Sequence, residues 1–270
     1  MMETLLLTTG LGALIGLALA LTGAGGGILA MPLLILALHL TVVQAAPIAL
    51  LAVGLSAALG GLISLREKRL RYRAAGLVGI VGVVTAPLGI WAAHQIPVVP
   101  LTLIFSLVLT YVAILMIREA AGTGPQIPTD QKLPCVLNPD EGRLHWTARC
   151  TRALMLTGGV SGFLSGSLGV GGGFVIVPAL TRYTNLSLQS VVGTSLGIIA
   201  LVSAGSVTVA AASGLILWPV AIPFAVGSIV GMLLGSRLAG RVPPRRLKQA
   251  FGVMSLLAAA VMVMRTVSAT

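Results

Sequence analysis

The sequence predicts an all-α polytopic membrane protein built from two inverted-topology repeats. Three observations predict this class. First, 57% of the 270 residues are hydrophobic and 9% are charged, with a mean hydropathy of +1.05, whereas soluble domains carry about 25% charged residues. Second, the chain matches itself at one constant offset. Third, equivalent loops of the two halves carry opposite amounts of charge.

The uncharged runs of the first half are compared with the roughly 20 residues that a helix needs to cross a bilayer. The first run is interrupted by Gly23-Ala24-Gly25-Gly26-Gly27. Three uninterrupted runs follow it. The runs cover 4–21 with a continuation to 38, then 43–65, 74–93 and 98–117.

The second half repeats this order. Its first run is interrupted by Gly169-Val170-Gly171-Gly172-Gly173. The runs cover 153–167 with a continuation to 181, then 188–211, 215–236 and about 249–264. Pro32 and Pro178 differ by 178 − 32 = 146 positions, and the same offset aligns Phe105 with Phe251. Because residues other than the abundant glycines fall in step, the pattern indicates a duplication.

Loop charges indicate how the halves are related. The 66–73 loop holds five Lys or Arg residues, while its equivalent, 212–219, holds none; the 94–100 loop holds none, while the 237–248 segment holds five. Short loops rich in Lys and Arg stay in the cytoplasm, so the repeats are predicted to be inverted. Both termini then face the periplasm. Each glycine-interrupted segment must begin and end on one side, as a re-entrant hairpin of two half-length helices.

The predicted organisation is a first membrane repeat (1–117), a cytoplasmic linker (118–151) and a second membrane repeat (152–270), within one integral membrane domain. The first residues lack the positive region of a cleavable signal peptide, so we expect mature protein there. Cys135 and Cys150 lie in the linker. A reducing cytoplasm disfavours a disulfide, so we expect free thiols. His145 also lies in the linker, but a metal site would need more ligands at shorter spacing, so none is expected.

The glycine runs are the strongest candidates for a binding site, because irregular backbone survives at membrane depth only where it is buried in protein or lines a cavity. The second arm of each hairpin begins after its glycine run, so unpaired amides and the positive end of the helix dipole would face an anion. The predicted substrate-binding glycines are Gly25, Gly26, Gly27, Gly171, Gly172 and Gly173.

The alternative is that glycines only allow close packing of helices. It is the preferred interpretation for Gly12, Gly16, Gly158 and Gly162, which have four-residue spacing. Three consecutive glycines suit a backbone anion nest better than a packing face.

Hydroxyl groups form the second candidate set. Thr194 and Ser195 follow Gly193, which suggests a further helix discontinuity, and they are predicted to donate hydrogen bonds to a bound oxyanion. Ser165 and Ser167 precede the second glycine run. The alternative is that hydroxyls bond back to helix carbonyls or bridge helices, and we prefer it for the three hydroxyls at 203, 206 and 208.

Several classes of function lack their usual residues. The six acidic residues all lie outside the uncharged runs, no run has a central His, and no nucleotide-binding motif occurs. We therefore expect neither an enzyme nor an ATP-driven pump, and no cofactor. The basic loops are orientation signals, so nucleic acid is not an expected partner.

Two hydrophobic halves that each open with a Gly-x-Gly-Gly-Gly stretch and a following proline, together with Gly193-Thr194-Ser195-Leu196, resemble the TauE/SafE sulfite-exporter family of the 4-toluene sulfonate uptake permease group. The resemblance covers essentially the whole chain. It implies a bacterial inner-membrane transporter of sulfur-containing or carboxylated organic anions. It also implies anion contacts at the glycine runs and at Thr194 and Ser195. The first half departs from the pattern, with Ile48 and Ala49 at the equivalent positions.

The resulting expectation is a secondary transporter that exports a small sulfur-containing anion, sulfite or an organosulfonate, bound near the midplane of the membrane. The alternative is an anion channel or a non-transporting membrane scaffold of the same fold. The expected partners are the small anionic substrate and the lipid bilayer. The oligomeric state is open, a homo-oligomer included.

Overall fold

The computed structural model describes residues 2–23, 25–122, 135, 137–138, 143–144, 147–238 and 244–268. Within these residues the chain forms ten helices and one short antiparallel strand pair. The elements are α1 (Met2–Thr22), α2 (Gly25–Leu38), α3 (Val42–Arg66), α4 (Tyr72–Gln95), α5 (Val98–Ala121), β1 (Leu137–Asn138), β2 (Arg143–Leu144), α6 (Ala148–Leu168), α7 (Gly173–Tyr183), α8 (Leu188–Ala212), α9 (Trp218–Leu238) and α10 (Pro244–Ser268).

The helices have the lengths and surfaces of membrane spans. Among the described residues α1, α3, α4, α8 and α9 contain stretches long and apolar enough to cross a bilayer. Large apolar side chains point outward, with Val84, Leu107 and Leu156 exposing 68–71% of their surface. In a soluble protein such a surface would drive aggregation, whereas in a bilayer it contacts lipid. The prediction of an all-helical, polytopic membrane protein is therefore supported.

Hydroxyl caps begin the long helices. Thr41 caps α3, accepting from the amide of Gln44 while the Gln44 side chain accepts from the amide of Thr41. Ser187 caps α8 and accepts from the amide of Ser190. Thr147 caps α6 in the same way through the amide of Cys150. These side chains satisfy amides that the first helical turn leaves unpaired, so each helix begins at a position that the sequence marks.

Glycines hold α1 against α9. Gly227 and Gly231 of α9 lie on the backbone carbonyls of Thr9 and Ala13 of α1, where a Cβ atom would collide. The contacts advance together along both helices, so the two helices run parallel. Gly12 and Gly16 of α1 pack in the same way on the backbone of α9.

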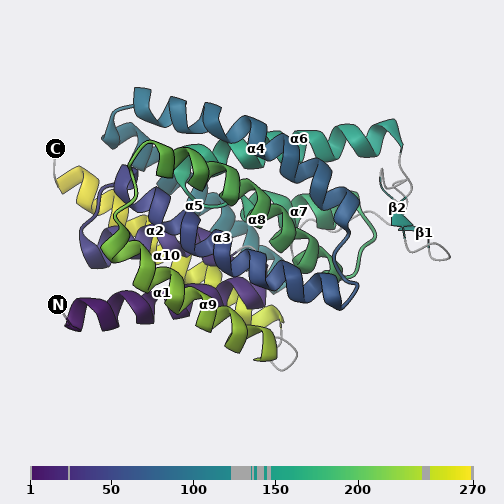
Figure 1. Cartoon of the computed structure of the whole chain (residues 1–270), viewed down its shortest axis with the longest axis horizontal. Coiled ribbons are helices and arrows are strands. Elements are labelled where there is room, and N and C mark those ends of the chain that lie inside the picture. Colours follow the sequence, from purple (N-terminus) through teal and green to yellow (C-terminus); the bar gives the residue numbers. More distant parts are fainter. Residues whose placement is uncertain are drawn as a thin grey trace.

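The pair α4 and α6 is packed by the same device. Gly158, Gly162 and Gly166 of α6 lie on the carbonyls of Val78, Gly82 and Ala86 of α4. The packing interpretation of Gly12, Gly16, Gly158 and Gly162 is thus confirmed. Figure 1 shows these pairs along opposite edges of the molecule, with α3 and α8 between them.

The centre of the bundle is the pair α3 and α8. Gly54 packs on Ser203, Gly61 on Gly197, and Ser64 on Gly193. The numbers rise on one helix as they fall on the other, so α3 and α8 run antiparallel. Outside them, α10 packs on α5, where Gly252 approaches the carbonyl of Ala113. Both termini lie at one end of the bundle and the strand pair lies at the other (Figure 1).

Two helix predictions are wrong. The first arms of the hairpins, α1 and α6, have 21 residues each, about 31 Å at 1.5 Å per residue, so they are not half-length helices. Only the second arms, with 14 and 11 residues, are short. The helix α8 continues through Gly193 without a discontinuity. A glycine inside an apolar helix marks a break only where its backbone leaves the helical conformation, and Gly193 instead makes room for Ser64.

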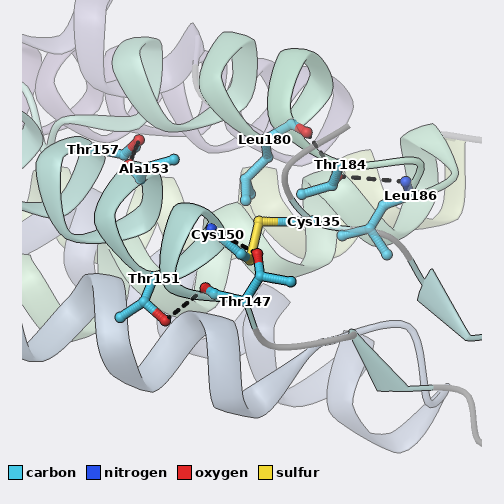
Figure 2. The surroundings of a disulfide bond; sticks show 9 residues. All are labelled: Cys135, Thr147, Cys150, Thr151, Ala153, Thr157, Leu180, Thr184 and Leu186. Carbon is cyan, nitrogen blue, oxygen red and sulfur yellow. Dashed lines mark hydrogen bonds between the residues drawn. A yellow bond between two sulfur atoms is a disulfide. The ribbon is translucent and has the colours of Figure 1, made fainter. Parts of the chain in front are cut away.

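The prediction of free thiols in the linker is also wrong. Cys135 and Cys150 form a disulfide with a Cα–Cα distance of 4.9 Å, and both are fully buried. Figure 2 shows how the pair comes together: Cys135 bridges the chain at Thr184, after α7, and Cys150 lies in the first turn of α6. Most of the rest of the linker, including His145, lies outside the described residues.

Candidate functional site

Left-handed glycines end the first arm of each hairpin. Gly23 (φ 70°) follows α1 and donates its amide to the carbonyl of Leu19. Gly169 (φ 67°) follows α6 and donates to the carbonyl of Ser165. A side chain is disfavoured in this conformation, so these two glycines fix where α1 and α6 end.

The second arm of each hairpin folds back on the first. Gly26, at the start of α2, packs on the carbonyl of Ile15 and on Leu19. Gly172, just before α7, packs on Ser161 of α6, whose hydroxyl donates to the Gly172 carbonyl at 3.2 Å. Contacts across 11 residues are impossible in a helix that continues straight. The glycine runs are therefore turns of helical hairpins.

The two breaks meet at the centre of the bundle. Gly27 contacts the carbonyl of Val170, and a Cβ at either Gly27 or Gly171 would touch the side chain of Val53, at 3.7 and 3.3 Å. Val53 is near the middle of α3. Two glycine runs that are far apart in the sequence thus lie side by side halfway along the longest helices.

Thr194 and Ser195 do not lie together with these central glycines. The hydroxyl of Ser195 donates to the carbonyl of Gly23 at 2.8 Å, and the hydroxyl oxygen of Thr194 accepts from the amide of Arg71 at 3.1 Å. Ser195 thereby holds the turn after α1, and Thr194 holds the connection before α4. Since a hydroxyl has one proton to donate, the proton of Ser195 is already used.

Two buried hydroxyls beside the second break have no hydrogen-bond partner. Ser203 on α8 and Ser165 on α6 are fully buried, and both Oγ atoms are unpaired. Neighbouring hydroxyls bond back to their helices as predicted: Ser206 donates to Val202 and Thr208 to Ala204. For Ser203 that preferred interpretation is wrong. No pattern in the sequence separates Ser203 from Ser206, because the difference lies in the contacts across helices.

A small cavity adjoins the second break. It holds about 40 Å³, compared with the roughly 10–15 Å³ that one water requires. Its wall includes Ala46 of α3, Gly166 at the end of α6 and Ser206 of α8, together with Leu215 in the connection before α9. Ala46 also contacts Gly169. The cavity thus lies next to Gly169, at the start of the second break, with Ala46 between them.

The electrostatics of the centre come from the backbone. The acidic residues of the chain lie at 3, 67, 119, 130, 140 and 141, away from the middle of every helix. No side chain caps α7 at Gly172. The amides of Val175 and Ile176 donate to the Gly172 carbonyl, so within the first turn the amides of Gly173 and Phe174 lack helix partners, at the positive end of the dipole. Among the described residues no cluster of His, Cys, Asp or Glu is suited to a metal ion.

Comparison with known proteins identifies the family. The family model described as sulfite exporter TauE/SafE matches residues 8–262. A "Probable membrane transporter protein" of Xylella fastidiosa (strain Temecula1) is 34% identical over 270 residues, covering 98% of this chain and 97% of that protein. The "Probable membrane transporter protein YjnA" of Bacillus subtilis (strain 168) is 27% identical over 244 residues, covering 88% and 91%. No solved structure is significantly similar to the chain. With this match over nearly its whole length, the chain belongs to the sulfite exporter TauE/SafE family.

Proposed function

We propose that the protein is a secondary transporter that exports a small sulfur-containing oxyanion, sulfite or an organosulfonate, across the bacterial inner membrane. Two inverted units would alternate access to a site between the glycine breaks. The observation that carries this proposal is the meeting of the two breaks at Val53, in the middle of the bundle. The family to which the chain belongs and the printed names of its relatives support transport.

Helix bounds support the repeat. The first residues of α6, α8, α9 and α10 each follow those of α1, α3, α4 and α5 by the same 146 positions (148 − 2, 188 − 42, 218 − 72 and 244 − 98). Packing is exchanged between the halves: α1 pairs with α9, and α6 pairs with α4. The equivalent helices α3 and α8 run antiparallel, as a two-fold axis in the membrane plane requires.

The breaks support an anionic substrate. Helix N-termini bind anions through unpaired amides and the dipole, and two such ends, those of α2 and α7, are directed to one central region. No carboxylate lies nearby to repel an anion. We propose Gly25, Gly26, Gly27, Gly171, Gly172 and Gly173 as the residues that form this region. The Ser195 hydroxyl donates to Gly23 and the Thr194 hydroxyl accepts from Arg71, so we propose that both side chains act by holding this region in place.

The membrane potential supports export. An inside-negative potential favours exit of an anion by about 2.3 kcal/mol per charge per 100 mV, or about a fifty-fold gradient. Proton-coupled uptake through intramembrane carboxylates lacks its usual residues here. Export therefore needs no coupling ion. Periplasmic termini follow from the loop charges and an inner-membrane location from the family resemblance, and both belong to the same proposal.

The test is sulfite efflux from proteoliposomes under an imposed potential. We expect efflux that saturates with internal sulfite, speeds up when the inside is made negative, and needs no sodium gradient. Net current that rises linearly with concentration would indicate a channel. Absence of flux, together with no anion-dependent change in melting temperature, would indicate a scaffold. A strict sodium requirement would refute the uniport mechanism.

A further inference from the structure

We infer that the anion binds at the second break alone, through the hydroxyls of Ser203 and Ser165 and the first-turn amides of α7, and that the first break is a packing joint. This inference rests on the proposed function and narrows its site: of the six proposed glycines it keeps Gly171, Gly172 and Gly173 beside the anion and assigns Gly25, Gly26 and Gly27 to packing.

Ser203 is placed to face the second break. Its Oγ lies 3.6 Å from the position that a Cβ on Gly171 would occupy. The side chain is fully buried and its hydroxyl has no partner. On its other side it packs on Gly54 of α3. A buried hydroxyl without a partner is costly, and a ligand that accepts its proton would remove this cost.

Ser165 approaches the same region from α6. It follows Ser161 by four residues, so both lie on one face of the helix, and Ser161 contacts Gly172. Ser161 donates its proton to the Gly172 carbonyl, whereas Ser165 has no partner. The second break therefore has one hydroxyl that fixes the backbone and two that are available to a ligand.

The start of α7 supplies the remaining donors. Gly171 and Gly172 have φ values of 73° and 68°, and no side chain caps the helix. The helix is 11 residues long, sufficient for a dipole at its first turn. The amides only donate, and the two hydroxyls can each donate one hydrogen bond, which matches a small oxyanion whose oxygens accept.

The first break lacks the equivalent chemistry. At an offset of 146, the positions of Ser161, Ser165 and Ser203 correspond to Ile15, Leu19 and Ala57. All three are fully buried and apolar. Unpaired amides facing only apolar side chains would bind an anion far more weakly than the same amides beside two hydroxyls.

Space also differs between the breaks. At the first, Gly26 is closed by Leu19 and the Ile15 carbonyl, and Gly27 is closed by the carbonyl of Val170. At the second, a Cβ on Gly172 would likewise meet Ser161, whereas the nearest atoms to a Cβ on Gly171 are 3.3 Å away. The cavity next to this break is lined by Gly166, which follows Ser165 in the sequence, and by Ser206, which lies about one helical turn after Ser203.

The test compares Ser203→Ala and Ser165→Ala with a matched control, Thr208→Ala. Thr208 is on α8 as well, but it is exposed and bonds to its own helix. Binding of sulfite is measured from the rise in melting temperature of the detergent-purified full chain. We expect each serine variant to raise the Kd for sulfite about ten-fold or more, as for loss of a hydrogen bond to a charged group, and the control to bind like the wild type.

A second readout separates ligand binding from structural support. Without sulfite, the serine variants should melt no lower than the wild type, because each removes a buried hydroxyl that has no partner. Wild-type stabilisation by sulfite that is unchanged in both variants would overturn the inference and leave the proposed function standing. Wild-type protein that responds to none of sulfite, thiosulfate, sulfate and sulfoacetate would refute the proposed function, and the inference with it.

Discussion

The disulfide offers a sharp test of both stability and orientation. Cys135 joins the linker to the end of α7, where its amide donates to the carbonyl of Tyr183, and Cys150 lies in the first turn of α6. The bond therefore fastens the open end of the second hairpin. Reduction, or the double substitution of both cysteines by alanine, releases this end.

The magnitude follows from the length of the closed loop. The cysteines are 15 positions apart, and a loop of that size gives about 3 kcal/mol of stabilisation in the chain-entropy model. For a chain of this size, that corresponds to a drop of roughly 6–12 °C in melting temperature. We expect dithiothreitol to lower the melting temperature of the wild type by this amount and to leave the double variant unchanged. Equal melting of reduced and oxidised wild type would refute the reasoning.

The redox state of the pair in cells reports its compartment. The proposed orientation, which rests on the basic loops, puts the linker in the cytoplasm, where thiols are kept reduced. If that orientation holds, both cysteines react with maleimide in cells that are quenched with acid and then alkylated, and the bond seen in the structure forms only on purification in air. A pair that is already oxidised in the cell would place the linker in the periplasm and reverse the orientation derived from charge.

The remaining predictions concern helix contacts. Ser195→Ala should destabilise the fold by about 1–3 kcal/mol, because it leaves the buried Gly23 carbonyl unpaired, with an unchanged Kd for sulfite; a weakened Kd at unchanged stability would make Ser195 a substrate contact. Gly162→Ala should lower the melting temperature, since its Cβ meets the Gly82 carbonyl, while Gly159→Ala on the same helix, with nothing closer than 3.9 Å, should not; equal effects would contradict the packing assigned to α4 and α6. Ser56 donates to Ser228 at 2.8 Å, so the double alanine variant should cost less than the sum of the single ones; additive losses of stability would contradict coupling between α3 and α9.

Much of the fold could be predicted from the sequence, because the bilayer sets local rules. An uncharged run must be about 20 residues long to span, and polar groups mark its ends. The predicted run 43–65 and the helix Val42–Arg66 differ by one residue at each end. The predicted run 188–211 and the helix Leu188–Ala212 start at the same residue and differ by one residue at the end. The start of the first arm in the second half was predicted less well. Helix α6 begins at Ala148, five residues before the uncharged run, because its first residues include Arg149 and Arg152.

The location of the breaks was also determined by sequence alone. The left-handed conformations at Gly23 and Gly169 turn the chain where a side chain would be disfavoured, whereas Gly25, Gly26 and Gly27 form the first turn of α2. That these turns lie against Val53 could not be read from the sequence, because it depends on how α3 and α8 cross. The prediction that the glycines bind the anion stays a prediction.

Only the tertiary structure decided which hydroxyls are available and which cysteines pair. Ser195, Ser203 and Ser206 are serines of the same helix. Nevertheless Ser195 donates to Gly23, Ser203 has no partner, and Ser206 donates to a carbonyl of its own helix. In a helix that is apolar on all sides, the pattern of side chains does not indicate which face meets which neighbour. Composition and glycine position are local properties that act along the chain, whereas a hydroxyl's partner and a disulfide's partner are set by helices far away in sequence.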